Sequence, residues 1–569
     1  MYFLALATDY DGTLASSGVV QQSTIAALEK LRASGRKLLL VTGRQIEDLL
    51  RVFPRAELFE WIVAENGALL YCPRTRDWRL LTEPVPAELE ADLRTRGVDT
   101  VDSGRAIVST WRPHECTVLE ALRDLGIDRQ IIFNKRAVMV LPTGINKSSG
   151  LMGALNEVKI SPHNVVAVGD AENDLPMLKE CACGVAVANA LDSVKEQADL
   201  VTSGDHGAGV EELIAEILDN DLARWLEPGG GRGLLFGSAK EDPERSVMIP
   251  SLGHSVLVAG PSGSGKSTAI TGLIERLAEA AYQFCLFDPE GDYEGFEPAV
   301  NLGNPHYEPG PNEVLTLLER AHSAVVNLLG IGIDRRPAYV SEVVRKLDDL
   351  RHQKGRPHWM IFDEAHHIFP SHMPPESTVL PGPPATSLMI TVHPRHMRKE
   401  ALAAASIVIA VGKDPHETLR DFCRSGGVAE PALDEILLDQ GEALVWFRTL
   451  DGAPFVVKVA RGKTEHRRHI RKYAQGDMGS SSFVFRGPQG KLNLTAQNFD
   501  NFVRMGTGVD EETWLYHLRA HDYSRWMRDK VKDLDLAREV EEIENEDVPA
   551  ARSREQIFAA IRGRYTAAA

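Results

Sequence analysis

The sequence has little that would place the protein in a membrane or in an oxidising compartment. No apolar run approaches the ~20 residues that a transmembrane helix requires. No basic leader is seen at the start, so we expect a cytoplasmic protein. The six cysteines lack the paired spacing of a zinc site or a disulfide framework. Basic residues are also outnumbered, and the formal net charge of −18 offers no general attraction for nucleic acid.

The length of 569 residues is too great for one hydrophobic core and predicts several domains. Apolar runs alternate with amphipathic stretches over residues 1–226 and again over 245–462, which predicts two α/β domains with parallel sheets covered by helices. Shorter alternating segments at about 80–141 indicate a small α+β cap inserted in the first domain. A proline- and glycine-rich stretch, 227–244, is the predicted linker. Residues 463–569 are expected to form a mixed, mainly helical module of unknown role.

Ten short apolar runs are the candidate strands of these two domains. They are residues 4–7, 37–41, 61–64, 164–168 and 184–187 in the first, and 254–259, 284–287, 359–362, 388–392 and 407–411 in the second.

A first set of phosphate-handling residues follows the first predicted strand. That strand would deliver Asp9 and Asp11 to the carboxyl edge of the sheet, where ligands bind in open α/β folds. Their spacing of two points both carboxyls to the same side. We expect Asp9 to attack phosphorus, and Asp11 to protonate the leaving oxygen and later activate water. Since two carboxylates beside a phosphate need a cation, we expect Mg²⁺ on Asp9, Asp11 and Asp170.

These residues resemble the haloacid dehalogenase (HAD) superfamily of phosphohydrolases, and the resemblance covers the whole first domain. Thr42, in Val-Thr-Gly-Arg, looks like the residue of the second motif that holds the phosphoryl group, and Lys147 looks like the third-motif lysine that neutralises its charge. The segment 169–174 looks like the fourth motif, in which Asp170 would bind the metal. Further residues expected to support the site are Arg44, Asn66, Asn173 and Asp174.

The sequence Glu-Asn-Gly-Ala at 65–68 is typical of the HAD branch with a cap between the second and third motifs. That branch includes Cof-type sugar phosphatases and archaeal phosphoglycolate phosphatases. The resemblance therefore implies a Rossmann-like, doubly wound sheet and a small phosphorylated metabolite as substrate. It also implies a hydrolase that works through an aspartyl-phosphate intermediate.

A second set of phosphate-handling residues occupies 260–267, Gly-Pro-Ser-Gly-Ser-Gly-Lys-Ser, between an apolar strand and a helical stretch. Glycines let successive N–H groups face a phosphate, while Lys266 would reach the β- and γ-oxygens and Ser267 would ligate Mg²⁺. Asp363 would hold the metal through water, and Glu364 would polarise the attacking water. ATP is the expected nucleotide because no guanine-reading Asn-Lys-x-Asp is present. The residues expected to bind it are Gly260, Gly263, Gly265, Lys266, Ser267, Thr268 and Asp363.

The second domain resembles the HerA/FtsK-type translocase ATPases over roughly residues 245–460. The segment 288–293 looks like their Asp-Pro-His-Gly-Glu-Tyr element, with Glu290 in place of the usual histidine, and Thr391 falls where they carry a polar sensor. Asp-Glu-Ala-His at 363–366 also spells a helicase motif, but the late Gln-x-x-Gly-Arg-x-x-Arg element of that class is absent. The resemblance implies a ring-shaped homo-oligomer with arginine fingers, for which the candidates are Arg395, Arg398, Arg420 and Arg424.

Two functions stay open at this point. The first is a metabolic phosphatase whose ATPase domain regulates it or couples it to assembly, and the intact motifs and the cap favour it. The second is an ATP-driven nucleic-acid machine, in repair or defence, whose HAD domain processes nucleotides or nucleic-acid ends, and the translocase resemblance favours it.

The C-terminal module carries no recognisable chemistry. Its aromatic residues Trp514, Tyr516, Tyr523 and Trp526 could stack bases, but their spacing of three or four is more typical of a packed helical core. The basic run 467–472 and the acidic stretch 533–547 are interpreted as solvated helix faces.

Overall fold

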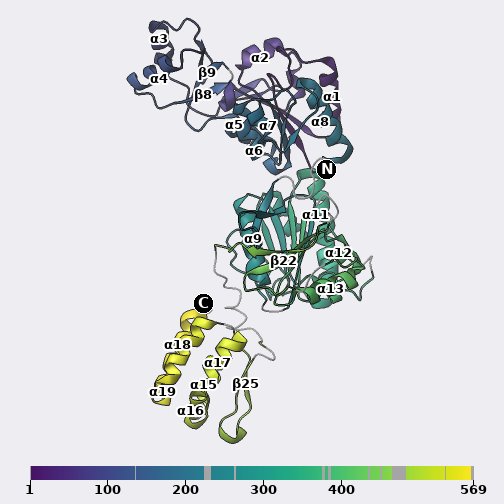
Figure 1. Ribbon diagram of the computed structural model, residues 1–569, viewed down its shortest axis with the longest axis vertical. Helices are drawn as coiled ribbons and strands as arrows, with labels where there is room; N and C mark the ends of the chain where they lie inside the picture. Colours follow the sequence, from purple (N-terminus) through teal and green to yellow (C-terminus); the bar gives the residue numbers. More distant parts are fainter. Residues whose placement is uncertain are drawn as a thin grey trace. The chain divides into compact units, whose positions relative to one another are not determined.

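The computed structural model describes residues 2–565 except 135, 223–231, 262–263, 375–377, 382–385, 433–435, 449–451, 464–477, 479–481, 532 and 547. It contains two compact units (Figure 1). The first consists of Met1–Glu290 and Phe296–Arg461, and the second of Gly291–Gly295 and Gly462–Ala569. Within the described ranges, no helix is both long enough and apolar enough to span a bilayer.

The first unit begins with an eight-stranded sheet in the order β12-β11-β10-β1-β2-β3-β4-β5. Six strands are parallel: β1 (Ala5–Asp9), β2 (Lys37–Val41), β3 (Trp61–Ala64), β10 (Val165–Gly169), β11 (Cys183–Ala186) and β12 (Leu200–Val201). An antiparallel edge is added by β4 (Leu69–Cys72) and β5 (Asp77–Leu80). The central strands are buried on both faces, as their continuous apolar sequences predict.

Helices cover both faces of this sheet (Figure 1). On one side α1 (Gln22–Ala33) packs against α8 (His206–Asn220), and on the other α5 (Lys147–Val158) packs against α6 (Leu175–Glu180). The buried side of α1 consists of Thr24, Ile25, Leu28 and Leu31, which recur at helical spacing. The doubly wound sheet predicted for this domain is confirmed.

The segment between β5 and α5 forms the predicted α+β cap. Its four-stranded antiparallel sheet has the order β6-β7-β9-β8. The strands are β6 (Asp102–Ser103), β7 (Val108–Trp111), β8 (Gln130–Asn134) and β9 (Ala137–Leu141). Helices α3 (Ala87–Thr95) and α4 (Glu115–Asp124) pack on it through a separate small core that includes Leu89, Leu93, Val118 and Val138.

The first unit continues with an eleven-stranded sheet in the order β14-β13-β23-β22-β21-β15-β20-β19-β16-β18-β17. Seven strands are parallel: β15 (Ser255–Ala259), β16 (Phe284–Asp288), β17 (Val300–Leu302), β18 (Ala324–Asn327), β19 (Trp359–Phe362), β20 (Thr386–Thr391) and β21 (Ile407–Ala410). The helices that accompany them are α9 (Lys266–Glu279), α10 (Pro311–Glu319), α11 (Arg336–Lys354), α12 (Lys399–Ala404) and α13 (Pro415–Gly426).

Four antiparallel strands complete this second sheet. They are β13 (Gly233–Ala239), β14 (Ser246–Pro250), β22 (Glu442–Phe447) and β23 (Phe455–Val459). Thus residues 233–239, which the sequence analysis assigns to the linker, form a strand instead. The reason is that Leu234 and Phe236 are buried, on either side of the exposed Leu235. Residues 227–231 of the predicted linker lie outside the described residues.

The amino ends of strands from the two sheets are joined by buried polar contacts within the first unit. Asn164, just before β10, is fully buried and donates its amide to the carbonyls of Tyr2 (3.1 Å) and Gly355 (3.2 Å). His358, just before β19, accepts the N–H of Gln283 at Nδ1. Its proton therefore lies on Nε2, which is 3.2 Å from the side-chain oxygen of Asn164.

The second unit is mainly helical, as predicted. It contains α15 (Phe499–Gly508), α16 (Glu511–Arg519), α17 (Asp522–Trp526), α18 (Leu534–Asn545) and α19 (Ala550–Tyr565), with a hairpin of β24 (Phe483–Phe485) and β25 (Leu494–Ala496). Trp514, Tyr523 and Trp526 are buried in its aromatic core, whereas Tyr516 is 46% exposed. The predicted packed core is therefore correct for three of the four residues. The basic run 467–472 lies outside the described residues.

Candidate active sites

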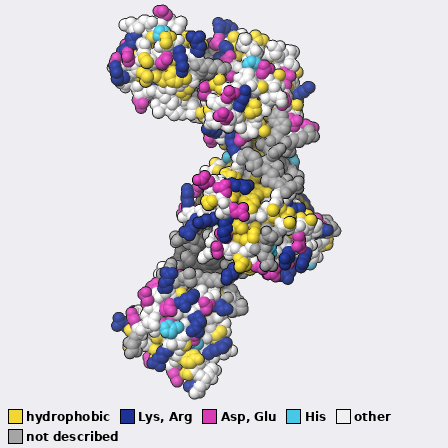
Figure 2. Space-filling model, in the orientation of Figure 1, with side chains coloured by type: hydrophobic (Ala, Val, Ile, Leu, Met, Phe, Trp, Pro, Cys, Tyr) yellow, Lys and Arg dark blue, Asp and Glu magenta, His cyan; other side chains and the backbone are white. Residues whose placement is uncertain are grey.

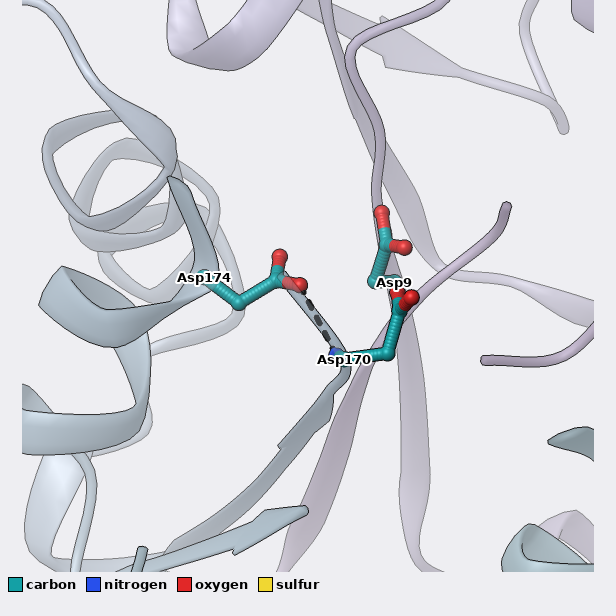
Figure 3. Close-up of side chains that lie close together, drawn as sticks. All are labelled: Asp9, Asp170 and Asp174. Atoms are coloured by element: carbon teal, nitrogen blue, oxygen red, sulfur yellow. Dashed lines mark hydrogen bonds between the residues drawn. The ribbon is translucent and has the colours of Figure 1, made fainter. Parts of the chain in front are cut away.

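The first candidate site lies at the carboxyl ends of β1 and β10, which are neighbours in the sheet. Asp9 ends β1, Asp170 follows β10, and Asp174 belongs to the short turn of helix after it. One carboxylate oxygen from each lies within 4.8 Å of the other two, and all three residues are buried (Figure 3). Oxygen ligands gathered in this way suit a hard divalent cation.

Lys147 is the cationic member of this cluster. It is the first residue of α5, which is held by a capping box between Asn146 and Ser149. Its Nζ donates to Asp9 Oδ1 (2.6 Å) and to Asp174 Oδ1 (2.5 Å). One ammonium group therefore faces three carboxylates, and the excess of negative charge leaves the site suited to a further cation such as Mg²⁺.

Burial dominates the electrostatics of this cluster. It raises the pKa of the Asp9 carboxyl well above the ordinary value, and the ammonium of Lys147 opposes this shift. Burial alone would lower the pKa of Lys147, but the carboxylates of Asp174 and Asp9 raise it above its ordinary value. Lys147 is therefore charged at neutral pH and can neutralise a phosphoryl oxygen.

The backbone around the cluster fixes the carboxylates. Asp174 Oδ2 accepts the N–H groups of Asp170 and Ala171, each at 3.0 Å, one of which is drawn in Figure 3. The Thr13 hydroxyl donates to Asp170 Oδ1 (3.2 Å). Gly12 passes so close that a Cβ there would lie 2.4 Å from Asp170 Oδ2. The loop after β1 is thus packed directly against the expected metal ligand.

Asp11 lies outside this acidic cluster. Its carboxylate receives two hydrogen bonds from Arg44, from Nε to Oδ2 and from Nη2 to Oδ1, each at 2.7 Å. Arg44 is held in turn by Asp48 (2.5 Å). The bidentate pair with Arg44 directs the Asp11 carboxylate elsewhere, so the structure brings together Asp9, Asp170 and Asp174 rather than the predicted set of Asp9, Asp11 and Asp170.

The remaining predicted residues of this site lie around the cluster. Thr42 directly follows β2, is fully buried, and accepts the N–H of Arg44 at its hydroxyl (3.1 Å). Asn66 accepts a hydrogen bond from the Asn173 amide (2.9 Å), and Asn173 directly precedes Asp174.

Sequence reasoning missed two side chains that hold the loop after β1. Asn189 Nδ2 and His206 Nδ1 are both within hydrogen-bond distance of the Gly12 carbonyl oxygen, at 2.7 and 2.9 Å. Because they are 177 and 194 residues away from Gly12 in the sequence, no local pattern could connect them to it. Thr13, by contrast, stands inside the motif that begins at Asp9 and could have been included.

The second candidate site is formed at the carboxyl ends of β15, β20 and β19, in that order across the sheet. Lys266 opens α9, and its Nζ donates to the carbonyls of Gly260 (2.7 Å) and Pro261 (2.8 Å). Gly265 has a φ of +92°, which favours glycine at this N-cap. Ser267 and Thr268 lie in the first turn of α9, whereas Gly263 lies outside the described residues.

The acidic pair of this site follows β19. Asp363 is buried, and Glu364 adopts the left-handed region with a φ of +40°. His366 Nδ1 lies 3.4 Å from Glu364 Oε2 and 3.2 Å from the hydroxyl of Thr391, which ends β20. Burial, together with the nearby histidines, lowers the pKa of His366 to about 4. The imidazole is therefore neutral, and it lies between the two predicted functional residues.

Three of the four arginine-finger candidates have acidic or polar partners in the chain itself. Arg398 is buried and donates to the Thr378 backbone carbonyl (3.0 Å). Arg395 pairs with Asp421 (3.6 Å) and Arg424 with Glu430 (3.8 Å). Arg420 is exposed on α13.

Two protein-family models match this chain. The model for haloacid dehalogenase-like hydrolases matches residues 6–93 and 112–214, and the model for the central domain of helicase HerA matches residues 240–426. The first match lies on the eight-stranded sheet, and the second contains the parallel strands of the eleven-stranded sheet but not β13, β22 and β23.

The first domain is also similar to whole proteins. A phosphoglycolate phosphatase of Methanothermobacter thermautotrophicus is 30% identical over 221 residues, which are 38% of this chain and 98% of that protein. Phosphoglycolate phosphatase 2 of Saccharolobus solfataricus is 27% identical over 236 residues, 39% of this chain and 96% of that protein. A solved haloacid dehalogenase-like hydrolase from Bacteroides thetaiotaomicron is 21% identical, with a TM-score of 0.33 over 38% of this chain and 99% of that one. The chain therefore belongs to the haloacid dehalogenase-like hydrolases, as a phosphatase domain fused to a HerA-type P-loop domain.

Proposed function

We propose that the first domain is a Mg²⁺-dependent phosphatase for a small phosphorylated metabolite, a sugar phosphate or a compound like phosphoglycolate. The observation that carries this proposal is the buried carboxylate of Asp9, hydrogen-bonded to Lys147 and grouped with Asp170 and Asp174. The phosphoglycolate phosphatases among the relatives support the substrate class. We further propose that the second domain binds and hydrolyses ATP.

Two steps would complete the first reaction. In the first, the Asp9 carboxylate attacks phosphorus and the bond to the leaving oxygen breaks, while Asp11, once released from its pair with Arg44, supplies the proton to that oxygen. In the second, Asp11 takes a proton from water, which attacks the aspartyl phosphate and releases inorganic phosphate. Lys147 and the Thr42 hydroxyl would hold the phosphoryl oxygens. A Mg²⁺ ion held by Asp9 and Asp170 would offset the charge between the carboxylates and the phosphate.

In the second domain, the contacts of Lys266 suggest how a nucleotide would be held. The ammonium group that now binds two loop carbonyls would bind the β- and γ-phosphates, with Ser267 and Asp363 around the metal. Glu364, which lies close to His366 and Thr391, would orient the attacking water.

A nucleic-acid machine is the second candidate function, and the match to the HerA central domain favours it. On the face drawn in Figure 2, however, basic and acidic side chains of the described residues are intermingled rather than separated by sign. Together with the net charge of −18, this arrangement favours the metabolic phosphatase. DNA-stimulated ATP hydrolysis at low salt would favour the alternative instead.

The test is a screen of phosphorylated metabolites, including phosphoglycolate and sugar phosphates, with and without Mg²⁺ and ATP. Asp9→Asn should reduce phosphate release at least about 1,000-fold, because the nucleophile is lost, and should spare ATP turnover. Lys266→Ala should do the reverse, so each variant is the control for the other. Full phosphatase turnover in Asp9→Asn would refute the first assignment, and unchanged ATP turnover in Lys266→Ala would refute the second.

A further inference from the structure

The loop that follows β3 contains three consecutive residues in the left-handed region. Glu65, Asn66 and Gly67 have φ values of +52°, +53° and +108°, although only the third is a glycine. Such a backbone persists only where its surroundings fix it. Here the N–H of Glu65 donates to the Arg44 carbonyl (2.9 Å), and that of Asn66 to the Thr42 carbonyl (3.0 Å). The loop is therefore bound to the segment that would hold the phosphoryl group.

The Glu65 side chain extends from this loop into the cap. It is fully buried, and its carboxylate accepts the backbone N–H groups of Arg105 (2.9 Å), Ala106 (2.8 Å) and Ile107 (3.3 Å). These groups belong to the turn between β6 and β7. Gly104 opens the same turn, and a Cβ there would lie 2.6 Å from Glu65 Oε2. Hydrogen bonds to a buried carboxylate are strong, so this contact binds the cap turn to the core.

The next two residues of the loop contact the sequence neighbours of Asp174 and Lys147. Asn66 donates to the sulfur of Met139 in β9 of the cap (2.7 Å) and accepts from Asn173, the neighbour of Asp174. Gly67 packs so tightly that a Cβ there would lie 1.9 Å from the carbonyl of Asn146, the N-cap of the helix that begins with Lys147. The three residues 65–67 thus contact the cap and also the segments that carry Thr42, Lys147 and Asp174.

We propose that Glu65 is a positioning residue that couples the cap to the catalytic cluster. Its carboxylate clamps the β6–β7 turn, and through the loop 65–67 the clamped turn keeps Thr42, Lys147 and Asp174 in register around Asp9. The steps of phosphate transfer given above do not use Glu65. The inference rests on the proposed phosphatase function.

Glu65→Gln tests the clamp because it keeps the size of the side chain but places an amide NH₂ against the N–H groups of the turn. We expect hydrogen exchange of the amides at 105–107 to become about tenfold faster. We also expect kcat for p-nitrophenyl phosphate to fall about 10- to 100-fold, with little change in KM. Glu47→Gln is the matched control, because it breaks the exposed ion pair of Glu47 with Arg105 in the same turn (2.5 Å) and should leave both measurements unchanged.

Gly104→Ala disrupts the same contact from the side of the cap and leaves the core domain unchanged. It should reproduce both effects, and it replaces Glu65→Gln as the test if that variant folds poorly. The double variant should lose no more kcat than either single variant, because both substitutions break the same contact. Faster exchange with an unchanged kcat would reduce Glu65 to a structural role and overturn the proposal, and unchanged exchange would overturn the clamp itself. A wild-type chain that cleaves no phosphomonoester would instead overturn the proposed function, an outcome that is distinct from both.

Discussion

Gly12 lies where the catalytic loop meets Asp170, and its lack of a side chain is what permits that approach. Its φ of +87° and the 2.4 Å that would separate a Cβ from Asp170 Oδ2 are two independent reasons for glycine at this position. The second reason concerns function, because the displaced atom would be an expected metal ligand.

Gly12→Ala should therefore lower phosphatase activity about 100-fold and raise the Mg²⁺ concentration needed for half-maximal activity. Phosphate release measured across a Mg²⁺ titration checks this. Gly35→Ala is the control, because Gly35 has a similar φ of +91° but open space around it. The control should cost about 1 kcal/mol of stability and no activity. Equal Mg²⁺ requirements in the two variants would contradict the role assigned to Gly12.

At the scale of single residues, the sequence predicted which side chains form the site better than it predicted their hydrogen-bond partners. Asp9, Asp170 and Lys147 were predicted from motifs and do lie together, because Asp9 ends a parallel strand, Asp170 follows the neighbouring one and Lys147 opens a helix at the same sheet edge. The pairing of Asp11 with Arg44 was not predicted, since two oppositely charged groups near one site give several possible pairs. Asn189 and His206 reach Gly12 only through the tertiary fold.

At the scale of elements, the amino end of α5 determines where Lys147 stands. The Asn146 side chain accepts the N–H of Ser149 (2.9 Å), and the Ser149 hydroxyl lies 3.0 Å from the N–H of Asn146. These bonds satisfy groups that every helix leaves free at its amino end. Lys147 is the next residue, so the cap of the helix also orients the ammonium group that we propose to hold the phosphoryl oxygens.

Asn146→Ala should destabilise the protein by about 1 kcal/mol and lower phosphatase activity about tenfold. Asn498→Ala removes an equivalent cap from α15, where the side chain accepts the N–H of Asn501 (2.8 Å). It should cost similar stability without affecting phosphate release. Thermal unfolding and turnover of both variants provide the comparison, and full activity in Asn146→Ala would show that the cap does not orient Lys147.

Elements with continuous apolar sequences were predicted well. The predicted strands 37–41, 61–64 and 359–362 match β2, β3 and β19 residue for residue, because parallel strands buried on both faces have uniform apolar composition. The antiparallel strands of both sheets were missed, and so were the short parallel strands β12, β17 and β18. In β13 the glycines at 233 and 237 suggest a flexible linker, whereas pairing with β14 and β23, far along the sequence, makes it a strand.

At the scale of the whole molecule, the contact between Asn164 and His358 joins the two sheets of the first unit. Burial lowers the pKa of His358 well below its ordinary value, and nearby His163, Arg356 and Arg351 lower it further. The folded protein therefore keeps this imidazole neutral. In the unfolded chain this imidazole binds a proton with an ordinary pKa of about 6.5. The contribution of His358 to the stability of the folded protein is therefore fully present above that pH and is lost as the pH falls below it.

We expect the thermal stability of the full chain to decline between pH 7 and pH 5. His358→Gln should flatten that decline by up to about 1.4 kcal/mol per pH unit, the value for one proton. Scanning calorimetry at several pH values measures this. His352→Gln, an exposed histidine on α11, is the control and should leave the slope unchanged. An unchanged slope in His358→Gln would contradict the neutral state assigned to His358.

The contact between Asn164 and His358 also bears on how the two candidate sites could influence each other. Asn164 and His358 stand at the starts of β10 and β19, while Asp170 and Asp363 stand just beyond the finishes of those strands. β10 has five residues and β19 has four, so they are about 17 and 13 Å long, and each acidic site lies a full strand length away from the buried contact. A signal between the two sites that passes through this contact would therefore have to travel along both strands.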